Sequence, residues 1–137
     1  MKRAVYAVIV ISLLVGCLGV IGCGRGGGSP AEVVKAFYMA ANEAKYSEAE
    51  GYLSSETKEL MKSPLVALGG GLKATVDMAT KNGTIERIEI TGERIRGEGA
   101  MVYFTLYFED GTQRSKAETL IQEGGRWKIT IEPMGGI

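Results

Sequence analysis

Tyrosines and carboxylates are the side chains of this sequence that could perform acid–base chemistry together. Tyr38, Tyr103 and Tyr107 each carry a phenol, and Asp77 or Glu118 could supply a carboxylate. If a tyrosine and one of these carboxylates faced the same apolar pocket, burial would raise the carboxylate pKa toward neutrality and make proton transfer feasible. The sequence contains no histidine, which removes the commonest general base at neutral pH.

Structural roles explain the same residues more simply. Tyrosines on strands usually pack with the ring and leave the hydroxyl in water. Glu118 alternates with Arg114 and Lys116, which is typical of a solvated sheet face. A lone tryptophan on a terminal strand is more often part of the core than of a ligand pocket. We therefore assign no catalytic residue and keep as candidate pocket residues Tyr38, Asp77, Tyr103, Tyr107, Glu118 and Trp127.

Lipid attachment is a further chemistry, indicated by a cysteine near the N-terminus. Lys2 and Arg3 precede an uncharged apolar run that ends in Val-Ile-Gly-Cys at positions 20–23. This order resembles the bacterial lipoprotein signal, in which the cysteine after the run receives the lipid. Each acyl methylene buried in a bilayer contributes about 0.8 kcal/mol of membrane affinity. We therefore expect Cys23 to be the lipidated residue of a membrane-anchored protein.

Two alternatives to this anchor remain. Leu-Val-Gly-Cys at 14–17 fits the same pattern, which makes Cys17 the second candidate, and an uncleaved apolar helix over 4–22 would nearly span a bilayer. We favour Cys23 because a flexible glycine-rich segment follows it. The expected organisation is a signal peptide at 1–22, a lipidated cysteine and tether at 23–29, and a folded domain at 30–133. Under each alternative the domain lies on the extracytoplasmic side of the cell membrane.

Composition restricts the partners of the domain. Lys and Arg together number 16, as do Asp and Glu, and the basic residues are scattered rather than clustered. A nucleic-acid partner is therefore not expected, because phosphate neutralisation needs a basic face. Neither cysteine lies beyond position 23, so the domain must fold without a disulfide. With no histidine and dispersed methionines, the sequence predicts no metal site and no cofactor.

Helices are predicted in the first half of the domain. Ser29, Pro30 and Glu32 form a capping pattern ahead of an apolar stripe over 33–44. A second helix is expected from Ser47, and a third from Ser54 or Ser55 to the Ser-Pro pair at 63–64. After three glycines at 69–71, which we interpret as a hinge rather than a phosphate loop, another helix carries Leu72, Val76 and Ala79 and ends at a left-handed Asn82-Gly83 cap.

Strands are predicted from residue 84 onward, where the apolar period changes to two. Ile88 and Ile90 indicate the first strand, and the second, over 101–108, is bulky on both faces and should be interior. Asp110-Gly111 is a strong hairpin signal, and a glycine pair at 124–125 precedes the last strand. The sequence therefore predicts an α+β domain, with N-terminal helices packed on a four-stranded antiparallel meander.

The order of helices and meander resembles the nuclear transport factor 2-like fold, a curved sheet wrapped around helices to form a cone. The opening Ser-Pro-Ala-Glu-Val-Val helix at 29–34 and the terminal Trp-Lys-Ile strand at 127–129 carry this resemblance. In particular the chain is similar to uncharacterised bacterial lipoproteins with that fold. The resemblance implies a cone whose enzymes use Asp, His and Tyr inside it, and this sequence cannot supply the histidine.

Three functions follow as expectations. The first is a lipid-tethered module, not an enzyme, whose concave sheet face binds a small apolar ligand or a protein of the cell envelope. The second is an enzyme of the cone fold that uses a tyrosine and a carboxylate. The third is a structural module that forms a homodimer through its sheet. A pocket that holds Asp77 or Glu118 within hydrogen-bond reach of a tyrosine would keep the second function as a candidate.

Overall fold

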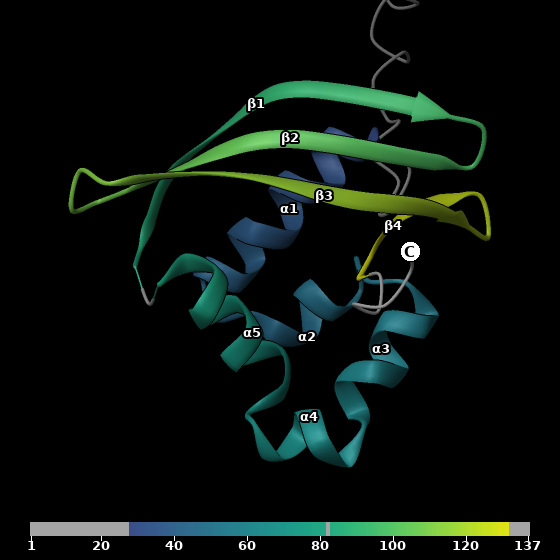
Figure 1. The fold of residues 1–137 in the computed structure, drawn as a ribbon, viewed down its shortest axis with the longest axis horizontal. Helices are drawn as coiled ribbons and strands as arrows, with labels where there is room; N and C mark the ends of the chain where they lie inside the picture. The colour runs from purple at the N-terminus through teal and green to yellow at the C-terminus, as the bar shows by residue number, and fades with distance from the viewer. Residues whose placement is uncertain (1–27, 82, 132–137) are drawn as a thin grey trace, which may run out of the picture.

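The computed structural model describes residues 28–81 and 83–131, so the predicted signal peptide, Cys17 and Cys23 lie outside the described residues. Within these ranges five helices precede four strands, and the helices gather against one face of a curved sheet (Figure 1). This confirms the predicted α+β order. The elements are α1 (Pro30–Asn42), α2 (Tyr46–Glu50), α3 (Ser55–Lys62), α4 (Pro64–Leu68), α5 (Gly71–Thr80), β1 (Ile85–Arg96), β2 (Gly99–Phe108), β3 (Gln113–Glu123) and β4 (Arg126–Thr130).

The longest helix, α1, begins where the sequence predicts. The Ser29 hydroxyl accepts the Glu32 N–H at 3.3 Å, and the Glu32 carboxylate accepts the Ser29 N–H at 2.8 Å, which completes a capping box. Pro30 lies in the first turn, where its missing N–H has no cost. The helix buries Val34 completely. Ala44 does not extend the apolar stripe as predicted, because it is exposed beyond the helix end with a φ of 58°.

The short helices α2 and α3 differ from the prediction mainly where they begin, and α4 is a further helix that the sequence analysis does not predict. The second helix starts at Tyr46, one residue before the expected cap Ser47, and no side chain caps it. Ser54, one of the two predicted caps of α3, accepts a backbone N–H at 3.2 Å. Ser63 and Pro64 end α3 and start α4, because the residue before a proline avoids the helical region. None of the helices in the described ranges is long and apolar enough to span a bilayer.

The helix α5 follows the glycine run and ends earlier than predicted. Gly70 adopts a φ of 97°, which turns the chain between α4 and α5 and is a conformation that glycine adopts readily. The left-handed cap is Lys81, with a φ of 53°, and the expected cap residue Asn82 lies outside the described residues. Thr80 is the buried residue at this end, whereas Ala79, predicted to point inward, is half-buried.

The four strands pair in sequence order, all antiparallel, which confirms the predicted meander. Strand β2 lies between β1 and β3, as its bulky residues on both faces indicate. The Phe108 N–H donates to the Thr112 carbonyl at 2.9 Å and closes the predicted hairpin, in which Gly111 has a φ of 84°. Edge strand β1 contains two register irregularities, and such bulges bend and twist a strand.

The face of β3 that meets the helices contradicts the sequence interpretation. The register places Lys116 opposite Phe104 and Glu118 opposite Val102, and directly paired residues share a face. Phe104 and Val102 are 1% and 0% exposed, so Lys116 and Glu118 point toward the helices. The expected solvated face of Arg114, Lys116 and Glu118 is therefore wrong. The alternation was identified correctly but assigned to the opposite side of the sheet.

The core lies between α1, α2, α5 and the inner face of the sheet. It is closed at strand β4 by the segment that joins α2 to α3. The Ile129 N–H donates to the Tyr52 carbonyl at 2.8 Å, and the Ser54 N–H donates to the Ile129 carbonyl at 2.9 Å. The largest fully buried hydrophobic side chains are Tyr38, Phe104, Leu53, Leu106, Leu120 and Ile129.

Truncating a buried leucine and an exposed leucine should change the stability of the domain by different amounts. Leu120 is 0% exposed on β3, and we expect Leu120→Ala to lower the free energy of unfolding by about 2–5 kcal/mol because it leaves a cavity. Leu65 on α4 is 84% exposed, so Leu65→Ala is the matched control and should change the same quantity by less than about 0.5 kcal/mol. Urea unfolding followed by circular dichroism measures both. Equal effects of the two substitutions would contradict the described core.

Candidate functional site

Tyr38, Lys116 and Glu118 form a polar cluster between α1 and the inner face of β3. The Tyr38 hydroxyl donates to Glu118 Oε1 at 2.5 Å and accepts from Lys116 Nζ at 2.8 Å. Lys116 Nζ also lies 3.7 Å from Glu118 Oε1, as an ion pair whose side chains are about one fifth exposed. A tyrosine and a carboxylate from the predicted candidates are thus within hydrogen-bond reach, 80 residues apart in sequence.

Burial sets the protonation of this cluster. Burial first, and then the charge of Glu118, raises the pKa of the Tyr38 phenol far above its usual value. Tyr38 therefore remains protonated and acts as a hydrogen-bond donor at neutral pH. Burial lowers the pKa of Lys116, and the nearby Arg114 lowers it further, while the Glu118 carboxylate opposes both effects.

An interior cavity of about 60 Å³ adjoins the polar cluster. Pockets that bind small molecules usually enclose about 300–1,000 Å³. In this conformation the interior does not accommodate an organic ligand of ordinary size. The cavity is lined by Phe37, Tyr38, Leu53, Met61, Leu72, Thr75, Val76, Ala79, Lys116, Glu118, Ile129 and Ile131.

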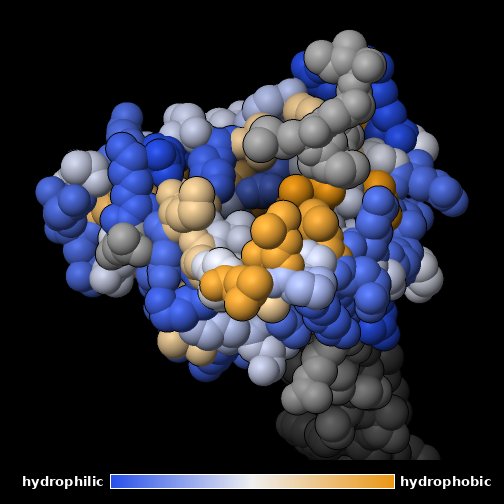
Figure 2. Space-filling model, turned by 60° about the horizontal axis from the view of Figure 1, so that its bottom comes forward, coloured by the Kyte–Doolittle hydropathy of each residue, from blue (hydrophilic) through white to orange (hydrophobic). Residues whose placement is uncertain are grey.

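The helical end that covers this interior has an apolar outer surface. Hydrophobic side chains gather on the face that carries α4 (Figure 2), and Leu65 and Leu68 of this helix are 84% and 89% exposed. Helix α4 buries none of its residues in the core. Among the described helices, α4 is consequently the one that the core holds least firmly.

The three groups of the polar cluster bond to one another. Tyr38 bridges Lys116 and Glu118, and in the described residues no fully buried side-chain nitrogen or oxygen lacks a partner. Hydrogen-bonded polar groups of this kind help to make a core rigid and specific. The cluster can therefore act as a structural bridge between α1 and β3 without any substrate. In residues 28–81 and 83–131, no group of three or more acidic or cysteine side chains is arranged to hold a metal ion.

The remaining predicted pocket residues lie elsewhere. Asp77 forms an ion pair with Lys73 on the exposed side of α5. Tyr103 and Tyr107 lie on the outer face of the sheet, where the Arg87 guanidinium stacks 3.9 Å above the Tyr107 ring centroid. The structure therefore brings together only Tyr38 and Glu118 of the six predicted residues. Trp127 belongs to a separate site at the edge of the sheet.

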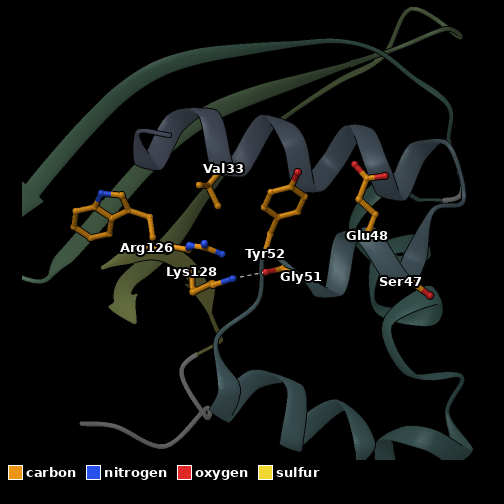
Figure 3. Close-up of a pocket in the computed structure, with 8 residues that line it drawn as sticks. Val33, Ser47, Glu48, Gly51, Tyr52, Arg126 and Lys128 are labelled. Atoms are coloured by element: carbon orange, nitrogen blue, oxygen red, sulfur yellow. Dashed lines mark hydrogen bonds between the residues drawn. The ribbon is translucent and has the colours of Figure 1, made fainter. Parts of the chain in front are cut away.

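This second site is a groove of about 520 Å³ between α1, α2 and β4, which we call the edge groove. Its volume lies within the usual range for small-molecule pockets. Figure 3 shows Arg126 and Lys128 at one end, Tyr52 in the middle and Glu48 at the other end, with Lys128 Nζ donating to the Gly51 carbonyl. The groove is lined by Val33, Ser47, Glu48, Gly51, Tyr52, Arg126, Trp127 and Lys128.

The sequence analysis named Trp127 as a candidate pocket residue but missed its two cationic neighbours. Trp127 is half-buried, packs against the core and also lines the groove. Arg126 and Lys128 alternate on either side of it, and this spacing on a terminal strand was a usable signal. Tyr52 and Glu48 could not have been placed there, because their position depends on how α2 and the segment after it lie against α1 and β4.

Comparisons with known proteins identify a family and a fold. Residues 21–130 match the family DUF4878, a domain of unknown function. A crystal structure of a Campylobacter jejuni protein described as an NTF2-like transpeptidase is 16% identical, with a TM-score of 0.56, over 77% of this chain and 100% of that one. A SEC-C motif containing protein from Rhodopseudomonas palustris is 15% identical, with a TM-score of 0.59, over 78% of this chain and 79% of that one. No curated protein matches the sequence.

At these identities the structural similarity shows the fold alone. The helices, the four-stranded meander and the NTF2-like neighbour together confirm the predicted nuclear transport factor 2-like architecture, an α+β cone. The matched family adds that this is a domain of unknown function.

Removing one hydroxyl should test whether the polar cluster supports the fold. Tyr38→Phe deprives Glu118 of a donor and Lys116 of an acceptor, so we expect it to lower the free energy of unfolding by about 1–3 kcal/mol in urea titrations. Tyr103→Phe is the matched control, because Tyr103 is 37% exposed on the outer face, and its effect should stay below about 0.5 kcal/mol.

Wild type and Tyr38→Phe should also differ in how their free energy of unfolding depends on pH. Because the Tyr38 pKa is raised in the folded state, its contribution to stability is present below the unfolded value of about 10 and is lost as the pH rises above it. The advantage of wild type over Tyr38→Phe should shrink by about 1.4 kcal/mol between about pH 9 and pH 11. Lys116 acts in the opposite direction, but it is present in both proteins. A pH-independent advantage would contradict the buried phenol.

Proposed function

The chain belongs to the DUF4878 family, a domain of unknown function, and we propose that it is a lipid-tethered module that binds a small ligand on the extracytoplasmic side of the cell membrane. The sequence supports the tether. A basic start, an apolar run, a cysteine at 23 and a glycine-rich segment follow one another as in bacterial lipoprotein signals. The folded domain would then stand outside the membrane on a short flexible segment.

The volume of the edge groove is the observation that supports ligand binding best. It is about 520 Å³, whereas the interior cavity is about 60 Å³. Trp127 and Tyr52 supply aromatic surface, and Ser47, Glu48, Arg126 and Lys128 supply polar groups around it. A few polar groups that converge on an aromatic wall are typical of small-molecule sites. We infer that the ligand occupies this groove rather than the inside of the cone.

Proton transfer inside the cone is a second candidate function, favoured by the 2.5 Å contact between Tyr38 and Glu118. We rank it below ligand binding for two reasons. The raised pKa keeps Tyr38 protonated, and Glu118 Oε1 already accepts from Tyr38 and pairs with Lys116. The adjoining cavity is also too small for a substrate of ordinary size.

The anchor can be tested by metabolic labelling with radioactive palmitate. We expect Cys23→Ala to abolish incorporation, because the acylated thiol is removed, whereas Cys17→Ala should label like wild type. Immunoblots of the membrane fraction control for expression. The reverse result would move the lipid to Cys17, and labelling of both variants would leave neither cysteine as the single attachment site.

Native mass spectrometry of the full chain, extracted in a mild detergent, tests the binding function. We expect wild type to retain a small organic molecule, and Ser47→Phe, which narrows the groove, to lose it. Met78→Phe is the control, because Met78 is 78% exposed on α5 and does not line the groove. Equal retention by both variants would exclude the edge groove as the site, and a bare wild-type mass would contradict the binding function. The same spectra report whether the chain forms the homodimer proposed from its sheet.

A further inference from the structure

The end of the edge groove at β4 presents two cations beside an aromatic residue. Arg126, Trp127 and Lys128 are consecutive, and all three line the groove. Among the residues that the structure describes, neither Arg126 nor Lys128 belongs to an ion pair. Lys128 donates to the Gly51 carbonyl, which uses one of its three N–H donors. Donors on both cations therefore remain for a ligand.

The electrostatics of this end favour an anion. Burial lowers the pKa of Lys128, and the neighbouring positive charges of Lys58 and Arg126 lower it further. The carboxylate that opposes this effect, Glu123, accepts the backbone N–H of Ser55 at 2.9 Å and the Ser55 hydroxyl. Glu123 is thus committed to the start of α3. A bound anion between the cations would relieve their mutual repulsion.

The opposite end of the groove has complementary chemistry. Ser47 and Glu48 lie there, on the far side of Tyr52 from the two cations (Figure 3). Glu48 is an acceptor for hydroxyl or ammonium groups, and Ser47 can donate or accept. Tyr52 and Trp127 offer apolar surface in addition. The ligand that fits all three features has an anionic group at one end, hydrogen-bond donors at the other, and a short carbon backbone between them.

The groove also lies close to the point where the described chain leaves the domain. Val33, which lines the groove, is in the first turn of α1. In the same turn the Ala31 N–H donates to the Glu93 carboxylate on β1 at 2.9 Å. If Cys23 carries the lipid, the six residue steps from Cys23 to Ser29 span at most about 22 Å. The cationic end of the groove would then lie within reach of the lipid headgroups.

We propose that the edge groove binds the glycerophosphate group of an anionic phospholipid, with Arg126 and Lys128 on the phosphate and Ser47 and Glu48 on the glycerol hydroxyls. The side chains of the groove indicate the chemical class of the ligand. That the ligand comes from the bilayer rests on the proposed function, which places the domain on a short lipid tether. Cations on the phosphate and aromatic residues at the headgroup level are a combination that suits membrane interfaces.

Trp127 is the only tryptophan of the chain, so its fluorescence reports directly on the groove. The full chain in neutral detergent micelles is titrated with short-chain phosphatidylglycerol, with short-chain phosphatidylcholine, and with free glycerol phosphate. We expect a saturable change in emission with phosphatidylglycerol and a much weaker one with phosphatidylcholine. The affinity should fall as salt is added, because the contacts are ionic.

Substitution of the two cations tests whether they bind the phosphate. We expect the double substitution Arg126→Gln and Lys128→Gln to weaken phosphatidylglycerol binding at least about tenfold, whereas Lys62→Gln, which removes one positive charge on α3 away from the groove, should bind like wild type. Tighter binding of free glycerol phosphate than of the lipid would show that the ligand does not come from the bilayer. No saturable response to either phosphate compound would overturn the proposal. A neutral molecule retained in native mass spectra would do the same while leaving the binding function intact.

Discussion

The packing of α1 against the inner face of the curved sheet is the interaction on which the rest of the structure depends. Residues 24–137 contain no cysteine, so no disulfide stabilises the domain. Val34 and Phe104 are buried almost completely at this contact, and the Tyr38 ring lies 5.1 Å from the Phe104 ring, centroid to centroid. The polar cluster is set into this apolar contact. It fixes how α1 lies on the sheet, and the position of α1 in turn forms one wall of the edge groove.

The features that the sequence could predict are those determined by neighbours in the chain. A capping box needs residues three positions apart, so the start of α1 at Ser29 was predictable. The same holds for the cap at Ser54 and the hairpin at Gly111, whose backbone angles few residues adopt. The end of α5 differed because Lys81 adopts the left-handed conformation that was assigned to Asn82-Gly83. Such shifts of one or two residues are usual at helix ends.

The candidate site was harder to predict because its contacts join distant parts of the chain. Nothing near Glu118 in sequence indicates Tyr38, which lies 80 residues away on α1. Alternation alone also cannot say which side of a strand faces the core, and on β3 the charged side was the inner one. Long side chains such as Lys116 can cover apolar surface while their charged end finds a partner. The sequence rule that charged residues face water therefore failed where three polar groups satisfy one another.

The attachment of the segment 52–54 to β4 has a further consequence, for self-association. An open sheet edge is a template on which another chain can add a strand and begin a fibre. At β4 the backbone groups of Ile129 are already occupied by Tyr52 and Ser54. The other edge, β1, is irregular in register and rich in charged side chains such as Arg94 and Arg96. Both edges of the sheet thereby hinder copies of this domain from joining edge to edge into polymers.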